Sequence, residues 1–234
     1  MPTGSDDRTV SIRTMREYLE PTEFVDSDHP TVRGFVDRAT DGATDERERI
    51  ARVFTAVRDG IRYDPYGMSL DRADYRASAV VGRDGAFCVP KAVLLVAAAR
   101  AMGIPARLAF ADVRNHLSSP RMLDLLGTDL FVYHGYGELH VDGAWRKASP
   151  AFNATLCERF GVEALDFDGT EDALLHPFSG DGSRYMEYVN DRGSHADLPF
   201  DAMMDELRRT YPRLHEVAGT TSRRADPAFA PTTD

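Results

Sequence analysis

The sequence predicts one domain of the α+β class, and three features of its 234 residues support this prediction. A long apolar helix is expected at Cys88–Met102, a β-hairpin follows at Leu130–Ser149, and a late helix lies near Asp201–Tyr211. One central helix followed by antiparallel strands differs from the alternating strand and helix pattern of a doubly wound parallel sheet. The chain is long enough to bury one hydrophobic core of ordinary size.

The two ends of the chain differ in composition from the part between them. Residues 1–9 and 219–234 are rich in Thr, Ser, Pro, Asp and Arg and show no apolar periodicity. Such segments are expected to be flexible tails. Residues 10–218 contain no long linker and no repeat, so we expect them to form a single domain.

Two helices are expected in the first quarter of the chain. The first begins near Pro30, with Asp28 or His29 as its N-terminal cap. The second spans about Asp45–Asp59, and Gly60 is expected to end it in a left-handed conformation. Its apolar residues recur at the helical spacing of one buried stripe: Ile50, Val53, Phe54 and Val57.

The helix at Cys88–Met102 is expected to lie in the middle of the fold. It follows an extended segment at Ile61–Tyr66, and its residues Ala92–Ala99 are apolar on every face. Gly103 is expected to cap its end, and the residues Ala106–Val113 form the next strand. This arrangement places the first residue of the helix close to the interior.

The hairpin is predicted from the dipeptide Asp142-Gly143, which favours a type I′ turn between Leu130–Val141 and Ala144–Ser149. A two-residue turn pairs the residues on either side of it and fixes the register along both strands. Side chains on a strand alternate between the two faces of the sheet. The register therefore places His134, Tyr136 and Ser149 on one face, with His134 and Ser149 as diagonal neighbours.

Composition and charge exclude several classes of function. The net charge is −10, which makes nucleic acids and anionic membranes improbable partners. No stretch of apolar residues is long enough to cross a bilayer, and the N-terminus lacks the pattern of a secretory signal. We therefore expect a cytoplasmic protein. Two cysteines, Cys88 and Cys157, are too few for a disulfide scaffold.

Cys88 is the first candidate for catalysis because it stands where the buried helix begins. Unpaired N–H groups at a helix start carry partial positive charge, so they favour a thiolate and can bind an oxyanion. Lys91, one turn later, adds positive charge. The alternative is an inert, buried cysteine, which is the more common role of a free thiol. Cys157 is expected to be such an inert, buried cysteine, packed in a short helix.

A thiol nucleophile needs a base, and His134 is the candidate that the hairpin offers. Gly135 and Gly137 follow it and indicate that another segment approaches this strand closely. The alternative for His134 is a core histidine that is hydrogen-bonded to the backbone. Asn115 and His116, after the preceding strand, and Tyr136, on the hairpin, are the candidates for binding substrate. The alternative role of Asn115 and His116 is solvation of a loop.

No metal or other cofactor is expected. The histidines at positions 116, 134, 140 and 195 match no compact ligand spacing for zinc. The acidic stretch Leu165–Gly169 lacks the ligand spacing of a calcium-binding loop and is expected to be a turn. The chemistry predicted from this sequence therefore depends on side chains alone.

A set of short motifs in a fixed order resembles the transglutaminase-like superfamily of papain-fold thiol enzymes. In this sequence the motifs are Phe87-Cys88-Val89, Gly103-Ile104-Pro105-Ala106-Arg107, His134, Asp142-Gly143-Ala144-Trp145 and Ser149-Pro150.

The resemblance covers about Ile61 to Asn153 and implies a papain-like core in which the helix that carries the cysteine packs on an antiparallel sheet. It also implies that Cys88 attacks an amide carbonyl and that His134 takes the proton. The expected substrate is an amide group of a peptide or protein, and we expect water as the acyl acceptor. An acyltransferase that uses a thioester donor on the same pair is a further alternative.

The sequence departs from the family pattern at the third position of the triad. The pattern has Asp before the proline, whereas this chain has Ser149. A serine can hold the imidazole by a hydrogen bond, but it lacks the charge that stabilises an imidazolium. Three interpretations remain open: Ser149 orients His134, a nearby residue such as Asn153 does so, or the site is a binding module with impaired catalysis.

Overall fold

The computed structural model describes residues 15–116, 118–175, 186–211, 213 and 229. The predicted tail at residues 1–9 lies outside this part of the chain, as does the tail at 219–234 apart from Phe229. The helices are α2 (Pro30–Ala39), α3 (Glu46–Gly60), the short 3-10 helix η1 (Arg72–Tyr75), α4 (Ala77–Val80), α5 (Cys88–Ala101), α6 (Pro120–Leu126), α7 (Ala154–Phe160) and α8 (Phe200–Thr210). The strands are β1 (Arg62–Tyr63), β2 (Gly85–Ala86), β3 (Ala106–Asn115), β4 (Leu130–Val141), β5 (Ala144–Ala148) and β6 (Met186–His195).

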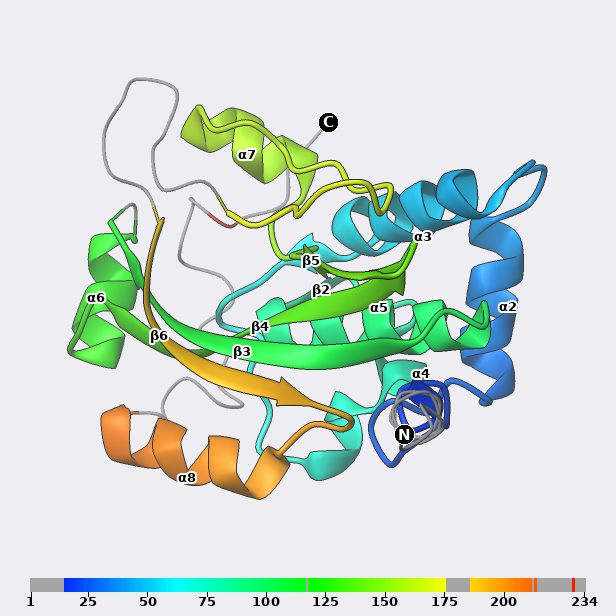
Figure 1. Cartoon of the computed structure of the whole chain (residues 1–234). Helices are drawn as coiled ribbons and strands as arrows, with labels where there is room; N and C mark the ends of the chain where they lie inside the picture. The colour runs from blue at the N-terminus through cyan, green and yellow to red at the C-terminus, as the bar shows by residue number, and fades with distance from the viewer. Residues whose placement is uncertain (1–14, 117, 176–185, 212, 214–228, 230–234) are drawn as a thin grey trace, which may run out of the picture.

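The main sheet has four strands in the order β5-β4-β3-β6, and all neighbouring strands are antiparallel. The short strands β1 and β2 form a separate parallel pair just before α5. Figure 1 shows α5 lying along the sheet, with α3 beside α5, α2 near one end of α5, and α8 beside β6. This arrangement confirms the predicted α+β class, with the cysteine-bearing helix packed on an antiparallel sheet.

Helix α5 is the centre of the hydrophobic core. All its residues from Cys88 to Arg100 are buried, as expected for a helix that is apolar on every face. It packs on β3 and β4, while α2, α3 and α4 pack against its remaining surface. Such a helix cannot shift without disturbing every layer of the domain, so its first residue has a fixed position.

The predicted helix ends are confirmed with one correction. His29 caps α2 by accepting a hydrogen bond from the Thr31 N–H, and Asp45 caps α3 in the same way through Glu48. Gly103 follows α5 with a φ of 82°. Gly60 was expected to adopt a left-handed conformation, but it is the last residue of α3 and its φ is not positive. The chain instead leaves α3 directly into the extended conformation of β1.

The hairpin between β4 and β5 has the predicted register. Val141 pairs with Ala144, and the ladder continues to Gly137 opposite Ala148. Asp142 and Gly143 both have positive φ, at 51° and 80°, as a type I′ turn requires. The strand β5 ends one residue before Ser149, so Ser149 lies just beyond the ladder.

Strand β6 is an element that the sequence analysis does not predict. It pairs with β3 at the edge of the sheet, and most of its side chains are exposed. Its residues are mostly polar, so it lacks the apolar alternation by which strands are recognised. Within the described residues, no helix has the length and apolar character needed to cross a membrane.

Candidate active site

Cys88 is the first residue of α5 and lies beside the part of β4 that β5 does not cover. The backbone N–H groups of Gly135, Val89 and Cys88 itself act on its sulfur and lower the pKa of the thiol. A Cβ atom added to Gly135 would lie 3.2 Å from the Cα of Val89, which is closer than most Cβ atoms approach another atom, so a larger residue there would have to displace α5 slightly. The close approach predicted from the two glycines is therefore present, and it brings the sulfur next to the residue after His134.

Burial controls the protonation of both candidate residues. The Cys88 side chain is 8% exposed, and desolvation raises the pKa of its thiol to about 11, although the backbone N–H groups lower it. Desolvation lowers the pKa of His134 to about 4. The helix start was expected to favour a thiolate, but the loss of water outweighs that effect here. The resting pair is therefore a neutral thiol and a neutral imidazole.

The backbone at His134 is shaped by a bulge in β4. His134 pairs with Ala111 of β3, but Phe131 pairs with Val113, so β4 contains one extra residue between the two pairs. Tyr133, within this bulge, has a φ of 57°. Positive φ is rare in residues with a side chain and costs about 1–3 kcal/mol, so surrounding contacts must hold it. A bulge at this position redirects the side chain that follows it.

Asp112 holds the bulge from the side of β3. Its Oδ1 accepts a 3.2 Å hydrogen bond from the Tyr133 N–H and a 2.5 Å bond from Nε of Arg192. Arg192 also pairs with Glu206 of α8 at 3.0 Å, and its guanidinium lies 4.5 Å from the centre of the Tyr133 ring. Asp112 is buried, so this ion pair is little screened by water.

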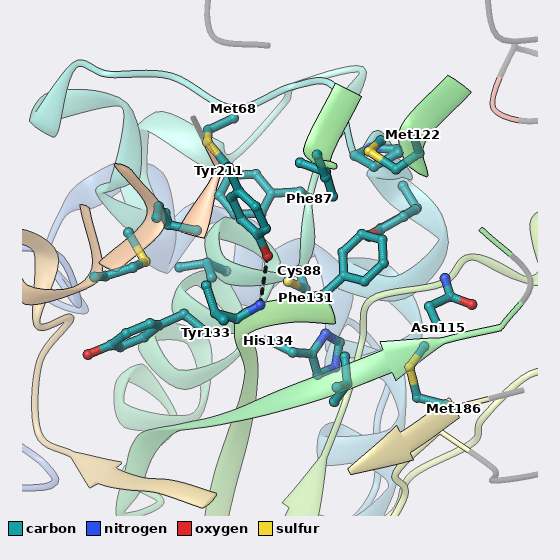
Figure 2. A pocket seen from close by; sticks show the side chains of 18 of the residues that line it. Met68, Phe87, Cys88, Asn115, Met122, Phe131, Tyr133, His134, Met186 and Tyr211 are labelled. Atoms are coloured by element: carbon teal, nitrogen blue, oxygen red, sulfur yellow. Dashed lines mark hydrogen bonds between the residues drawn. The ribbon is translucent and has the colours of Figure 1, made fainter. Parts of the chain in front are cut away.

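Tyr211, directly after α8, holds the same segment of β4 from another direction. Its hydroxyl accepts a 2.7 Å hydrogen bond from the Val132 N–H, and it donates a 3.0 Å bond to the Leu130 carbonyl. Figure 2 shows the first of these bonds as a dashed line. The sequence analysis does not identify Asp112, Arg192 or Tyr211, although a lone aspartate inside an apolar strand is a signal for the first.

The ring of His134 has none of the support that its backbone has. Among the described residues, neither Nε2 of His134 nor Oγ of Ser149 has a hydrogen-bond partner, and both atoms are buried. The two side chains therefore do not form the hydrogen bond expected of an orienting serine. The ring of Tyr188 lies edge-on to His134, with 6.3 Å between the ring centres.

Asn153, the other candidate for orienting His134, makes its hydrogen bonds to other residues. Its Oδ1 accepts a 2.9 Å hydrogen bond from the Tyr63 N–H, and its Nδ2 donates a 2.6 Å bond to Thr155. Asn153 thus connects β1 to the start of α7, which carries the buried, packed Cys157 that the sequence predicts. In this structure neither Ser149 nor Asn153 orients the imidazole.

Cys88 and His134 both line a cavity with about 700 Å³ of empty space, including its mouth to solvent. Figure 2 shows both residues among the side chains around it. Asn115, predicted to bind substrate, also lines this cavity. The other two predicted binding residues do not: His116 faces Glu187 at 3.5 Å, and Tyr136 is buried near Lys147.

Lys91 has a structural role rather than the expected role beside Cys88. Its Nζ donates hydrogen bonds to the carbonyls of Arg58 and Ile61, at 2.8 Å and 2.6 Å, where α3 ends. Burial lowers its pKa to about 7. Its charge lowers the pKa of Cys88, but by less than the nearby backbone N–H groups do. Lys91 therefore fastens α3 to α5 and contributes little to the thiol.

Metal-binding side chains do not gather in the described ranges. No group of three or more His, Cys, Asp or Glu side chains there could hold a metal ion. The acidic turn at Leu165–Gly169 uses its carboxylates within the protein: Asp166 pairs with Arg58 at 2.6 Å, and Asp168 accepts hydrogen bonds from Thr170.

Residues 33–150 match the family model described as the transglutaminase-like superfamily. The matched range runs from α2 to the residue after Ser149, and it includes α5 and the hairpin but neither β6 nor α8. No curated protein matches the chain.

Two solved structures are similar to this one. A "putative cysteine protease" from Cytophaga hutchinsonii has a TM-score of 0.49 and 16% identity, over 81% of this chain and 50% of that one. A "putative protease" from Parabacteroides distasonis has a TM-score of 0.36 and 17% identity, over 59% of this chain and 26% of that one. This chain therefore spans about half the length of the first protein and about a quarter of the second.

Proposed function

Because this chain belongs to the transglutaminase-like superfamily, we propose that it is a thiol-dependent acyl-transfer enzyme that acts on amide bonds of peptides or proteins. Cys88 is the nucleophile and His134 is the general base. The observation that carries the proposal is that the thiol and the imidazole line one cavity that opens to solvent. A nucleophile and a base that share a substrate cavity form the minimal apparatus for covalent acyl transfer.

The reaction has two steps. In the first, Sγ of Cys88 attacks the amide carbonyl carbon while His134 takes the thiol proton. The C–N bond then breaks, and the amine leaves with the proton from His134. In the second step, His134 takes a proton from water, the resulting hydroxide attacks the thioester, and the acid leaves as the thiol is restored. The N–H groups at the start of α5 stabilise the oxyanion in both steps.

The neutral resting pair fits this sequence of steps. A thiol with a pKa of about 11 and an imidazole with a pKa of about 4 do not exchange a proton before substrate arrives. The proton moves only when the developing bond from sulfur to carbon lowers the basicity of the sulfur. Catalysis therefore requires a bound carbonyl, and small reagents without binding contacts are expected to react slowly.

The test is amide hydrolysis by the full chain. The substrates are short peptide p-nitroanilides, and the measurement is the rate at which p-nitroaniline is released. We expect Cys88→Ala to abolish the release and His134→Ala to slow it by about 100-fold or more. Cys157→Ala is the matched control, because this second cysteine is buried and does not line the cavity. Release that persists in Cys88→Ala, or that disappears in Cys157→Ala, would rule out the proposed nucleophile.

A second candidate is a binding module that keeps the cavity without the chemistry. The observation that favours it is that Nε2 of His134 has no hydrogen-bond partner among the residues that the structure describes, with Ser149 at the position of the family's aspartate. Intact-mass measurement after rapid mixing with a peptide thioester separates the two candidates. The enzyme gains the mass of the acyl group on Cys88, whereas the module binds the peptide in calorimetry and gains no mass.

A further inference from the structure

We propose that the cavity beside Cys88 binds a bulky, uncharged, apolar side chain of the acyl donor and so selects for it. This inference rests on the proposed function and adds to it the class of substrate. It predicts donors with leucine-like or phenylalanine-like groups next to the reacting carbonyl, in preference to donors with charged or carboxamide side chains.

The walls of the cavity are apolar. Side chains from several helices, strands and loops converge on it, among them Phe87, Met122, Leu126, Phe131, Met203 and Leu207. Most of them are buried in the folded chain, so the cavity continues the hydrophobic core up to the sulfur. An apolar group that enters it leaves water for a surface of the same kind.

Charged groups are missing from this lining. None of the described residues that form the cavity wall is Asp, Glu, Lys or Arg. The hydroxyl of Tyr211 faces the cavity but is already bonded to the backbone at Leu130 and Val132. A charged donor side chain would therefore lose its water without gaining a counter-charge, which is strongly unfavourable.

Four methionines line the cavity: Met68, Met122, Met186 and Met203. The thioether side chain is flexible and polarizable, so it adapts to ligands of different shape. This composition favours a pocket that accepts several large apolar groups over one that fits a single side chain.

A neighbouring hollow shows that this wall accepts an aromatic ring. It shares Tyr63, Phe131 and Phe152 with the Cys88 cavity, and its lining includes the chain's own Phe229. The Phe229 ring lies 6.1 Å from that of Tyr63, and its carbonyl accepts a 2.7 Å hydrogen bond from Arg62. An aromatic residue with its backbone held by a polar side chain is thus already seated beside the proposed substrate pocket.

The test measures how fast N-acetyl aminoacyl chloromethyl ketones alkylate Cys88. The increase in the intact mass of the protein reports the alkylation. The four probes carry Leu, Phe, Asp or Lys beside the reactive ketone. We expect the Leu and Phe probes to react at least about tenfold faster than the Asp and Lys probes, as for other apolar pockets. Equal rates for all four probes would overturn the inference.

A pair of variants locates the preference in this cavity. Met68 is half-buried in the cavity wall, so Met68→Glu brings a carboxylate to the bound side chain. We expect this change to reduce the ratio of the Leu to the Lys rate by about tenfold. Leu70→Glu is the control, because Leu70 lies in the same loop, is 49% exposed and is outside the lining. An unchanged ratio in Met68→Glu would contradict the proposed location.

Failure of this inference can be told apart from failure of the proposed function. If alkylation depends on His134 but not on the probe's side chain, the function stands and the apolar selectivity is wrong. If no probe reacts faster with the wild-type protein than with His134→Ala, the proposed pair is wrong, and the selectivity falls with it.

Discussion

The backbone that carries His134 and the ring of His134 differ sharply in their support. On the backbone side, Asp112 and Tyr211 each bond a peptide group of the β4 bulge. On the ring side, Nε2 and the Oγ of Ser149 have no hydrogen-bond partner among the described residues. The difference teaches that the imidazole is placed through the main chain and through elements that follow the hairpin, rather than through a third side chain of a triad.

Some of the residues that support the bulge lie outside the part of the chain that matches the family model. The match to the family model ends at Pro150, whereas Arg192, Glu206 and Tyr211 belong to β6, α8 and the residue after it. The elements outside the match therefore support the bulge inside it. The four predictions below test the two sides of His134, in decreasing order of expected effect.

Breaking the support on the backbone side is expected to have the largest effect. Asp112→Ala removes the acceptor for the Tyr133 N–H and the buried partner of Arg192. Loss of one partner of a buried pair costs about 3–5 kcal/mol, and we expect the lower end because Arg192 keeps Glu206. Urea unfolding measures this loss.

The matched control for Asp112→Ala is Asp129→Ala. Asp129 pairs with Arg114 of the same strand, but both side chains are 39% exposed. Water screens such a pair, so its removal is expected to change stability little. Equal losses in the two variants would mean that the buried contact with the bulge has no special importance.

The ring side predicts a loss of stability in acid. The folded-state pKa of His134, about 4, lies below the ordinary value of 6.5, so the unfolded chain binds the proton more tightly. The neutral ring makes its full contribution to the free energy of unfolding above pH 6.5. This contribution is lost as the pH falls toward 4. Between pH 7 and pH 4.5 this amounts to about 2 kcal/mol. Urea unfolding at pH 7 and pH 4.5 should show that His134→Gln loses less free energy of unfolding than the wild-type protein does. Identical losses in the two proteins would indicate that the ring gains a partner when it is protonated.

Tyr211→Phe tests the second contact on the backbone side. It leaves the Val132 N–H without its acceptor, so we expect a loss of about 1–2 kcal/mol and slower acylation of Cys88. Tyr75→Phe is the control, because its buried hydroxyl donates one hydrogen bond, to Ser69, away from β4. We expect that variant to lose stability without slowing acylation. Equal rates in the two variants would limit Tyr211 to a structural role.

Ser149 is expected to give the smallest effect and the sharpest contrast. Because its Oγ has no hydrogen-bond partner in the described part of the chain, Ser149→Ala should change the free energy of unfolding by less than about 0.5 kcal/mol. Ser149→Asp supplies the family's carboxylate and should raise the pKa of His134 by about 1 unit or more. NMR titration of the imidazole measures this pKa. A large effect of Ser149→Ala would show that the serine orients His134 after all.

The sequence was sufficient to predict the central helix and the hairpin because both depend on local patterns. An apolar run of helical length fixes α5, and the Asp142-Gly143 turn fixes the register from Val141 to Gly137. These two elements bring Cys88 and His134 to one cavity. The neutral state of the pair could not be predicted, because it depends on how much water the folded chain removes from each group.

The bulge and its supports depend on contacts between distant segments, which local patterns do not encode. Tyr133 adopts a left-handed conformation that is rare for residues with a side chain, and its support includes the hydrogen bond from its N–H to Asp112 of another strand. Strand β6 is polar and exposed, so its pairing with β3 has no apolar alternation to predict it. Arg192 lies on that strand, so its role could not be predicted for the same reason.

The raised pKa of Cys88 has a consequence for the life of the protein in an oxidising environment. Peroxide attacks the thiolate, and a sulfur that stays protonated at neutral pH is slow to become a sulfenic acid. The burial that raises the pKa of Cys88 therefore also protects its thiol from oxidation.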